Sequence, residues 1–255
     1  MLNDLRNWFE FQREQFGEQI FHDNFDFNNI YDNFSSMNNK RNIIEKDHKV
    51  ILEKIFLKKS ASTVDLNWYN SQNIDELMNC ISNCKECELG NSRKNFVFGK
   101  GNHKAEIMII GEAPGADEDD QGEPFVGRAG QLLTKMLEAI ELQRDDVFIA
   151  NILKCRPPNN RRPSADEIRE CEPYLQKQIE IIKPKLILVL GLTAVSSLLK
   201  KDYKMSEIRG TVMDYRGIKL LISYHPAALL RNPAWKKPAW EDLQLLKKMY
   251  DNFKV

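Results

Sequence analysis

The five cysteines are the first residues whose type and spacing could do chemistry. Cys84 and Cys87 have C-x2-C spacing, and Cys155 and Cys171 follow at long range, separated by fifteen residues. Four such thiolates could hold either Zn²⁺ or an iron–sulfur cluster. A zinc ribbon usually has two short pairs, so the wide second spacing favours a cluster and leaves two alternatives, zinc or Cys171 as a buried apolar residue. Cys80 is then the spare thiol.

A glycine-rich segment, GEAPG at 111–115, follows a predicted strand and continues through ADEDD to EPF at 123–125. Small residues there let a ligand approach the backbone, whose N–H groups can hold an anion. Phe125 could stack on a planar ligand. The alternative is a charged, solvated loop, which suits the acidic run better than catalysis does.

A third motif, NILKCRPPNNRRP at 151–163, begins with an Asn at the end of a predicted strand. The amide of Asn151 could read the polar edge of a base. The basic residues that follow could form a local patch that binds phosphate, and these are Lys154, Arg156, Arg161 and Arg162. A structural Asn before a Pro-rich loop explains the pattern equally well.

A fourth motif, YHPAALLRNP at 224–233, follows the last predicted strand. His225 could donate a hydrogen bond to a developing anion. Leu229 and Leu230, on a Pro-bounded loop with basic flanks, could wedge between stacked bases. Taken alone, this motif fits a structural histidine and core leucines better.

Short apolar runs alternating with helical patterns must position these motifs, and they predict an α/β domain. The predicted strands are 106–111, 146–151, 185–191 and 218–224. The predicted helices are 128–142, 164–182, 192–200 and 235–253, the second with a capping box of Ser164 and Glu167. Several motifs therefore follow strand ends, where open α/β sheets bind ligands.

Residues 1–75 carry no chemical motif, no Pro and a single Gly. Their pattern predicts two amphipathic helices, 2–30 and 42–58, so we interpret this region as a helical extension of unknown role. Residues 76–255 form the predicted catalytic domain.

Lys plus Arg and Asp plus Glu both total 37, so the net charge is zero and any DNA binding must come from a local patch. The longest apolar run, ILVLG near 187, is too short to cross a bilayer, and the N-terminus lacks the apolar stretch of a secretory signal. We expect a cytoplasmic protein with no membrane association, whose odd number of cysteines argues against a disulfide framework.

Together the four motifs resemble the family 4 uracil-DNA glycosylases, which carry a 4Fe-4S cluster. The resemblance runs from about residue 75 to the C-terminus and involves GEAPG-x-x-ED, EPFVGRAGQLL, N-x-x-K-C-R-P-P-x-N-R-x-P and HPA-x-LLRNP. It implies a three-layer α/β/α sandwich around a mostly parallel central sheet. It also implies a hydrolase that flips uracil out of single- or double-stranded DNA and cleaves its N-glycosidic bond, which leaves an abasic site and starts base-excision repair. We expect a monomer.

The resemblance also assigns roles to residues. A 4Fe-4S cluster would be held by Cys84, Cys87, Cys155 and Cys171. The expected substrate-binding residues are Gly111, Ala113, Glu118, Phe125, Asn151 and His225, with the uracil ring stacked on Phe125, its edge read by Asn151 and its O2 contacted by His225. The expected DNA-binding residues are Arg156, Arg161, Arg162, Leu229, Leu230 and Arg231.

The water-activating group is not given by the resemblance. Relatives whose first motif is GQDPYH use its Asp to position water, and the matching position here is Ala113. We therefore hypothesise that Glu112 orients the water, which makes Glu112, Asn151 and His225 the predicted catalytic residues. Glu118 would lie near C5 of uracil and exclude thymine.

Two alternatives remain open: a non-catalytic iron–sulfur module that senses DNA damage, and a glycosylase for other deaminated bases. The joint presence of Phe125, Asn151 and His225 favours catalysis over the first. A nucleotide-binding enzyme with GEAPG as its phosphate loop is poorly supported, because no Lys-Ser/Thr follows the glycines.

Overall fold

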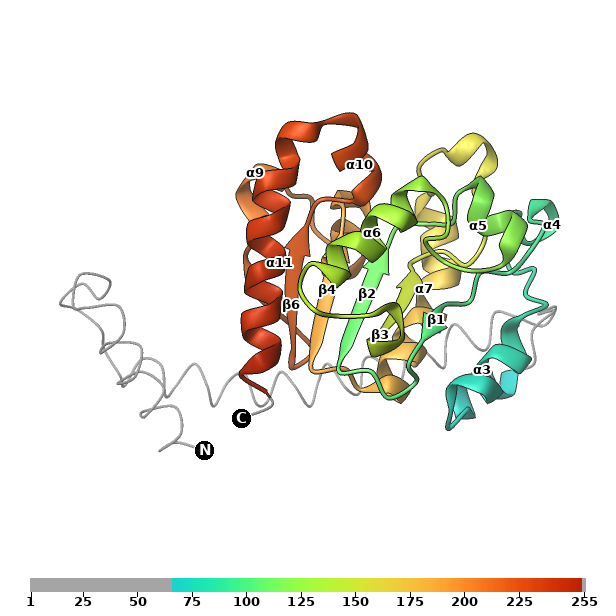
Figure 1. The fold of residues 1–255 in the computed structure, drawn as a ribbon. Helices are drawn as coiled ribbons and strands as arrows, with labels where there is room; N and C mark the ends of the chain where they lie inside the picture. Colours follow the sequence, from blue (N-terminus) through green and yellow to red (C-terminus); the bar gives the residue numbers. More distant parts are fainter. Residues whose placement is uncertain (1–65, 254–255) are drawn as a thin grey trace, which may run out of the picture. The chain divides into compact units, whose positions relative to one another are not determined.

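A six-stranded sheet lies at the centre of the computed structural model, which describes residues 66–253 (Figure 1). Its strands are β1 (Lys100–Gly101), β2 (Ile107–Gly111), β3 (Val147–Asn151), β4 (Leu186–Leu190), β5 (Val212–Tyr215) and β6 (Ile218–Ser223). Their order is β1-β3-β2-β4-β6-β5. The four inner strands are parallel, and β1 and β5 pair antiparallel at the two edges.

The inner strands form because their sequences are continuous apolar runs that can be covered on both faces. Every residue of β2, β3 and β4 is buried. Along β2, Met108 and Ile110 join one core while Ile107 and Ile109 join the other, because successive side chains point to opposite faces. Parallel pairing brings Gly111 opposite Asn151 at the ends of their strands.

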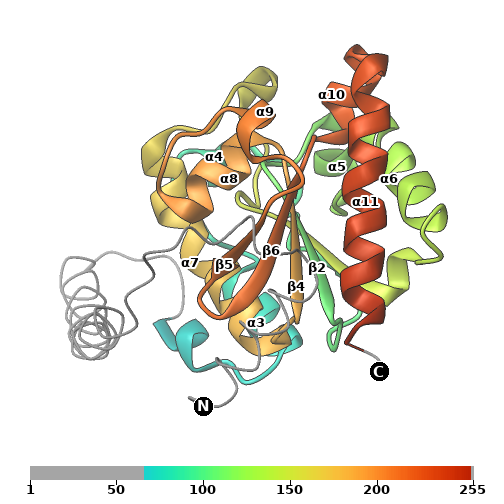
Figure 2. The same ribbon diagram turned by 90° about the vertical axis from the view of Figure 1, so that its left-hand side faces the viewer.

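Helices cover both faces of the sheet (Figure 2). One face packs against α3 (Ile74–Ile81), α7 (Ala165–Ile182) and α8 (Leu192–Leu199), and the other against α6 (Arg128–Glu138), α10 (Pro226–Arg231) and α11 (Lys236–Asp251). The predicted three-layer α/β/α sandwich around a mostly parallel sheet is confirmed. The shorter helical elements are η2 (Leu66–Asn70), α4 (Leu89–Ser92), α5 (Ala116–Gln121), η3 (Arg144–Asp146), η4 (Pro158–Asn160), α9 (Met205–Ile208) and η5 (Pro233–Trp235).

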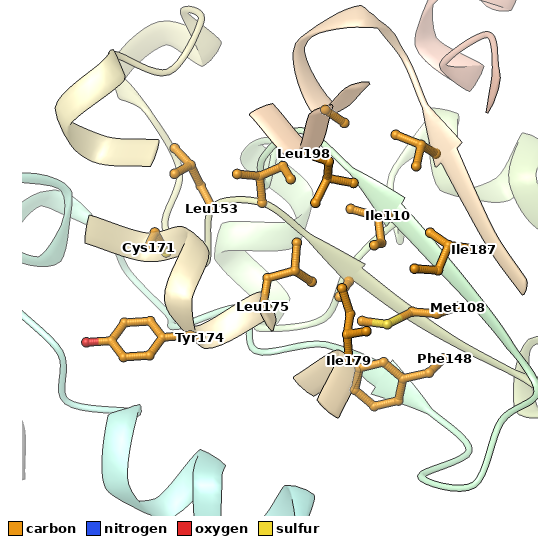
Figure 3. Close-up of a cluster of buried hydrophobic side chains, with 14 of the residues drawn as sticks. Met108, Ile110, Phe148, Leu153, Cys171, Tyr174, Leu175, Ile179, Ile187 and Leu198 are labelled. Carbon is orange, nitrogen blue, oxygen red and sulfur yellow. The ribbon is translucent and has the colours of Figure 1, made fainter. Parts of the chain in front are cut away.

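The core beneath α7 ties the helix to the sheet. Figure 3 shows Leu175 and Ile179 of α7 beside Met108 of β2 and Phe148 of β3. Burial of each such side chain contributes about 1.5–3 kcal/mol, so the relative positions of β2, β3 and α7 are strongly fixed. The predicted capping box begins α7: the backbone N–H of Glu167 donates to Oγ of Ser164, and the backbone N–H of Ser164 donates to the Glu167 carboxylate.

The four predicted strands and four predicted helices are confirmed, with small differences at their ends. The antiparallel edge strands were not predicted, nor was α5 in the acidic segment or α10 in the segment expected to be a loop. The predicted helix 128–142 ends earlier, at Glu138. Among residues 66–253, no helix is both long and apolar enough to cross a bilayer.

The predicted extension lies mostly outside the described residues, which begin at Leu66. In the part of the extension that the structure describes, the Trp68 ring packs edge-on against the Tyr174 ring of α7, with centroids 5.0 Å apart. The predicted boundary near residue 75 stays a prediction.

Candidate active site

A cavity of about 860 Å³ opens at the carboxyl ends of the parallel strands. Segments that follow β2, β3, β4 and β6 line it, as expected for an open α/β sheet. It brings together most of the predicted site residues: Glu112, Ala113, Glu118, Phe125, Asn151, Arg161, Arg162, His225 and Arg231.

The Asn151 amide is a buried polar group with an unused acceptor. Its residue is 2% exposed, and Oδ1 has no hydrogen-bond partner among the described residues. An ideal Cβ built on Gly111 would lie 2.4 Å from this oxygen, so only a glycine leaves room beside it. A buried acceptor without a partner is costly, which suits a site that receives a donor from a ligand.

The Phe125 ring forms an apolar wall beside this amide. A Cβ on Gly111 would lie 2.7 Å from the ring, and the His225 ring centroid lies 5.4 Å from that of Phe125. Phe125 has a φ of 54°, which a non-glycine residue adopts only when its surroundings hold it there. The arrangement gives a planar ligand an aromatic face next to a polar edge reader.

Glu118 holds the loop that carries Phe125. One carboxylate oxygen accepts from the backbone N–H groups of Val126 and Gly127, and the other from that of Gly115, each at 3.0 Å. Glu118 also lines the cavity, and its predicted role near C5 of uracil stays a prediction. Its carboxylate is nevertheless engaged in binding backbone, a role that the sequence had not indicated.

Arg144 also holds this loop and was not predicted. Its guanidinium donates to the backbone oxygens of Phe125 and Pro124, at 3.1 and 2.8 Å. Burial lowers the pKa of Arg144 from its ordinary value. Gly130 of α6 permits close packing, because a Cβ there would lie 1.8 Å from the Phe125 backbone oxygen. The strained residue is thus restrained by three separate elements.

His225 caps α10 and is held in one orientation. Its Nδ1 accepts a hydrogen bond of 3.2 Å from the backbone N–H of Ala227. Burial, assisted by the charge of Arg231, lowers the pKa of His225 to about 4. The ring is therefore neutral near pH 7, and because Nδ1 accepts, Nε2 carries the proton and can donate it to a ligand.

Glu112 and Ala113 line the cavity directly after β2. The backbone oxygen of Glu112 accepts from the backbone N–H of Leu153, which joins the loop after β2 to the loop after β3. The Glu112 side chain is half-buried. Its predicted role toward water stays a prediction.

The interpretation of Lys154 as part of a phosphate-binding patch is wrong, because its side chain is fully buried. Its Nζ donates to the backbone oxygen of Asn151 at 2.9 Å and to Oε1 of Gln178 at 2.6 Å. Burial lowers the pKa of Lys154 to about 8. Lys154 therefore supports the end of β3 from within the protein interior, and its side chain cannot reach solvent.

The arginines after it differ in availability. Arg161 makes a two-pronged ion pair with the buried carboxylate of Glu167, at 2.9 and 2.6 Å. Arg156 donates from Nε to Oδ1 of Asn160 and does not line the cavity, whereas Arg162 is exposed and does. A positive edge forms at the cavity, on which Arg162 is exposed while Arg161 is paired with Glu167.

The predicted wedge is a short helix, α10, and only part of it is exposed. Leu229 is 2% exposed and packs in the core beneath α6, while Leu230 is 39% exposed. Arg231 is exposed and lines the cavity. Burial argues against DNA contact by Leu229 and leaves Leu230 and Arg231 as the candidates.

Cys84, Cys155 and Cys171 are buried and Cys87 is partly buried, all within or against the core under α7. Burial raises the pKa of Cys155 to about 11 and also raises those of Cys87 and Cys171, with smaller contributions from the neighbouring cysteines. In the part of the chain that the structure describes, however, no three His, Cys, Asp or Glu side chains converge on one metal position.

Positively polarised groups surround these sulfurs. Arg93 donates to Sγ of Cys155 and the backbone N–H of Lys154 donates to Sγ of Cys171, both at 3.2 Å. Such donors stabilise thiolates, which are the form that binds metals. An all-sulfur donor set with nearby cations is chemically suited to an iron–sulfur cluster, and a cluster does not require its ligands to converge on one ion.

Comparison with known proteins identifies relatives of this chain. Residues 98–244 match the model of the uracil DNA glycosylase superfamily. A type-4 uracil-DNA glycosylase of Saccharolobus solfataricus is 50% identical over 184 residues, which cover 69% of this chain and 85% of that protein. The type-4 enzyme of Pyrobaculum aerophilum is 45% identical, covering 68% and 92%, and a type-5 uracil-DNA glycosylase of the same organism is 29% identical, covering 64% and 84%.

Proposed function

Since the chain belongs to the uracil DNA glycosylase superfamily, we propose that it excises uracil from DNA with the side chains of this cavity. The reaction hydrolyses the bond between C1′ of the sugar and N1 of uracil and leaves an abasic site for base-excision repair. The observation that carries the assignment of the site is the unpaired, buried Oδ1 of Asn151 beside the Phe125 ring. We place this activity in the cytoplasm, at the nucleoid.

Base recognition follows from hydrogen-bond complementarity. The Asn151 amide accepts from N3–H of uracil through Oδ1 and donates to O4 through its nitrogen, while Phe125 stacks on the ring. Cytosine presents the opposite donor and acceptor pattern on this edge, so it would leave buried polar groups unpaired. Glu118 keeps the cavity next to C5 too narrow for the methyl group of thymine. It does so either directly or through the loop that it holds.

Bond cleavage places negative charge on the departing uracil and positive charge on the sugar. Nε2–H of His225 donates to uracil O2 and stabilises that negative charge; a neutral donor aimed at a developing anion suits this task. Glu112 orients a water molecule whose oxygen bonds to C1′ as the bond to N1 breaks. The bonding electron pair leaves with uracil, and the proton that the water loses ends on N1 of the departing uracil anion.

The uracil must leave the base stack to reach the cavity. The exposed Leu230 and Arg231 lie on α10 at the edge of the cavity, where they can fill the gap in the DNA. Arg162 and Arg156 supply phosphate contacts, with a smaller share from Arg161 because Glu167 pairs with it. Both single-stranded and duplex DNA are substrates, and the protein acts as a monomer.

Cys84, Cys87, Cys155 and Cys171 would hold a 4Fe-4S cluster. The burial of these sulfurs and the donors beside them support this assignment. The cluster would cross-link the segment before β1 to the loop after β3 and the start of α7, and so fix the segment that follows Asn151. Its contribution is structural rather than a step of the reaction.

The test is release of free uracil from an oligonucleotide with one uracil, single-stranded or paired with guanine, beside matched strands with thymine or hypoxanthine. The proposal expects uracil release from both uracil strands and none from the thymine strand. Hypoxanthine release without uracil release would instead assign the chain to another deaminated base.

A further inference from the structure

Two stacked aromatic rings at the cavity have no role in the proposed reaction. Tyr224 and Trp235 lie with ring centroids 5.0 Å apart and an interplanar angle of 18°. Both residues line the cavity. Tyr224 directly precedes His225 after β6, and Trp235 ends η5 just before α11, so two elements join at this pair.

Trp235 is stacked on Tyr224 and is also partly exposed. Tyr224 is half-buried against the core, whereas Trp235 is 40% exposed. Stacking on Tyr224 orients the indole plane, which makes its second face a flat and fixed apolar surface. Trp240 of α11 has nearly the same exposure, 39%, but it does not line the cavity, so the position of Trp235 distinguishes it rather than its exposure.

Cationic residues line the same cavity or follow Trp235 directly in the chain. Arg231 lines the cavity, and the exposed Lys236 and Lys237 follow Trp235 in the first turn of α11. Cations are electrostatically disfavoured at a helix N-terminus, and no acidic residue in that turn offsets them. An aromatic ring with one cation in the same cavity and two more next to it in the chain suits a nucleotide, which has a flat base and an anionic phosphate.

We propose that Trp235, supported by Tyr224, is a stacking subsite for the base next to the flipped uridine on the same strand. Arg231, Lys236 and Lys237 contact the phosphates of that strand. Stacking on an aromatic ring is tolerant of base identity, because every base has a π face. The subsite therefore adds affinity for DNA without restricting the sequence around uracil. It rests on the proposed function, because it assumes that uridine enters the cavity.

The test is a double-mutant cycle between protein and DNA. The DNA is a single strand with 2′-fluoro-deoxyuridine, which resists cleavage, flanked by normal nucleotides or by an abasic analogue on the 5′ or the 3′ side. Binding is measured by fluorescence anisotropy for wild type, Trp235→Ala, Trp235→Phe and Trp240→Ala. With normal flanks, we expect Trp235→Ala to weaken binding about 5- to 100-fold, whereas Trp235→Phe should retain most of the affinity.

When the abasic analogue stands on one of the two sides of the uridine, the effect should vanish, and wild type and Trp235→Ala should bind that strand equally. Trp240→Ala should match wild type on every strand. A loss of affinity at Trp235→Ala that persists with either flank abasic would overturn the subsite, since the residue would then act only through the fold. Equal binding of Trp235→Ala and wild type to the normal strand would overturn it as well.

One further measurement separates this proposal from its premise. Uracil release by wild type is assayed independently: release without coupling at Trp235 rejects the subsite alone, and coupling at Trp235 without release rejects the proposed excision of uracil alone. If Trp235→Ala has a lowered melting temperature, Trp235→Leu replaces it in the cycle, because leucine preserves apolar volume against Tyr224 but offers no ring face.

Discussion

A Cβ on Gly111 would lie 2.4 Å from Oδ1 of Asn151. A methyl carbon and an amide oxygen cannot lie that close, so Gly111→Ala must displace the Asn151 amide, the Phe125 ring, or both. We expect uracil turnover to fall at least about 100-fold, with about 1–3 kcal/mol lost from the free energy of unfolding. Steady-state kinetics and urea denaturation measure the two effects.

Gly217→Ala is the matched control for this change. Gly217 has a φ of 84° but no atom within 4 Å of an added Cβ, so the substitution costs stability through backbone strain alone. It should lower stability and leave turnover unchanged. Equal loss of turnover in both variants would mean that activity follows stability and not the geometry at Asn151.

Glu118→Gln tests the loop that carries Phe125. Glutamine has one acceptor oxygen, so at least one of the three backbone N–H groups now bound by the carboxylate loses its partner. We expect a loss of about 1–3 kcal/mol in the free energy of unfolding and slower uracil release. Glu118→Gly should in addition permit thymine release; strict specificity in that variant would leave Glu118 with the loop-holding role only.

His225→Ala removes the donor assigned to the departing uracil. We expect turnover to drop about 10²- to 10³-fold with a smaller change in KM, because the bond strengthens as charge develops. The exposed His103 provides the control, and His103→Ala should keep full turnover. A change confined to KM would contradict the assignment and indicate ground-state binding.

The lowered pKa of His225 also predicts a pH dependence of stability. An unfolded histidine titrates near pH 6.5, whereas here the pKa falls to about 4 because of burial and the charge of Arg231. Between these values the unfolded chain binds more protons, so the stability tied to neutral His225 is complete above about pH 6.5 and is lost as pH falls toward 4. The difference between the urea midpoints of wild type and His225→Gln should shrink as pH falls across this window. A difference that does not change with pH would contradict the lowered pKa of His225.

The cysteine assignment predicts iron in the protein as isolated without oxygen. Cys155→Ser should lose iron, visible absorbance and thermal stability together, whereas Cys80→Ser should keep all three. Iron and sulfide analysis with an absorbance spectrum makes the comparison. Iron-free wild type, or zinc in place of iron, would reject the cluster.

The sequence predicted the inner sheet because β2, β3 and β4 are uninterrupted apolar runs that only burial on both faces explains. It did not predict β5, whose burial alternates only partly, or α5, whose six residues are mostly acidic. β5 forms because it pairs with β6, and α5 is bounded by a glycine at each end. Local patterns of hydrophobicity reveal neither feature.

The site residues at strand ends could be predicted because the strands themselves are recognisable as apolar runs, and open α/β sheets bind ligands where such strands end. The environment of single side chains could not be predicted. Lys154 was expected to be a surface cation, but it is buried and donates to the backbone oxygen of Asn151. Leu229 was expected on an exposed loop, but it is buried on α10. Arg144 gave no signal, because its contact with Phe125 spans nineteen residues and uses backbone oxygens. Gly191 and Thr193 after β4 line the cavity and could have been found from the strand-end rule alone.

The most direct measurement is uracil release by wild type and Asn151→Ala from the same single-stranded oligonucleotide, with alkali cleavage to score abasic sites. The account predicts cleavage at uracil by wild type, none at cytosine or thymine, and loss of nearly all cleavage in the variant at unchanged melting temperature. Undiminished cleavage by Asn151→Ala would contradict the claim that this unpaired amide reads the base.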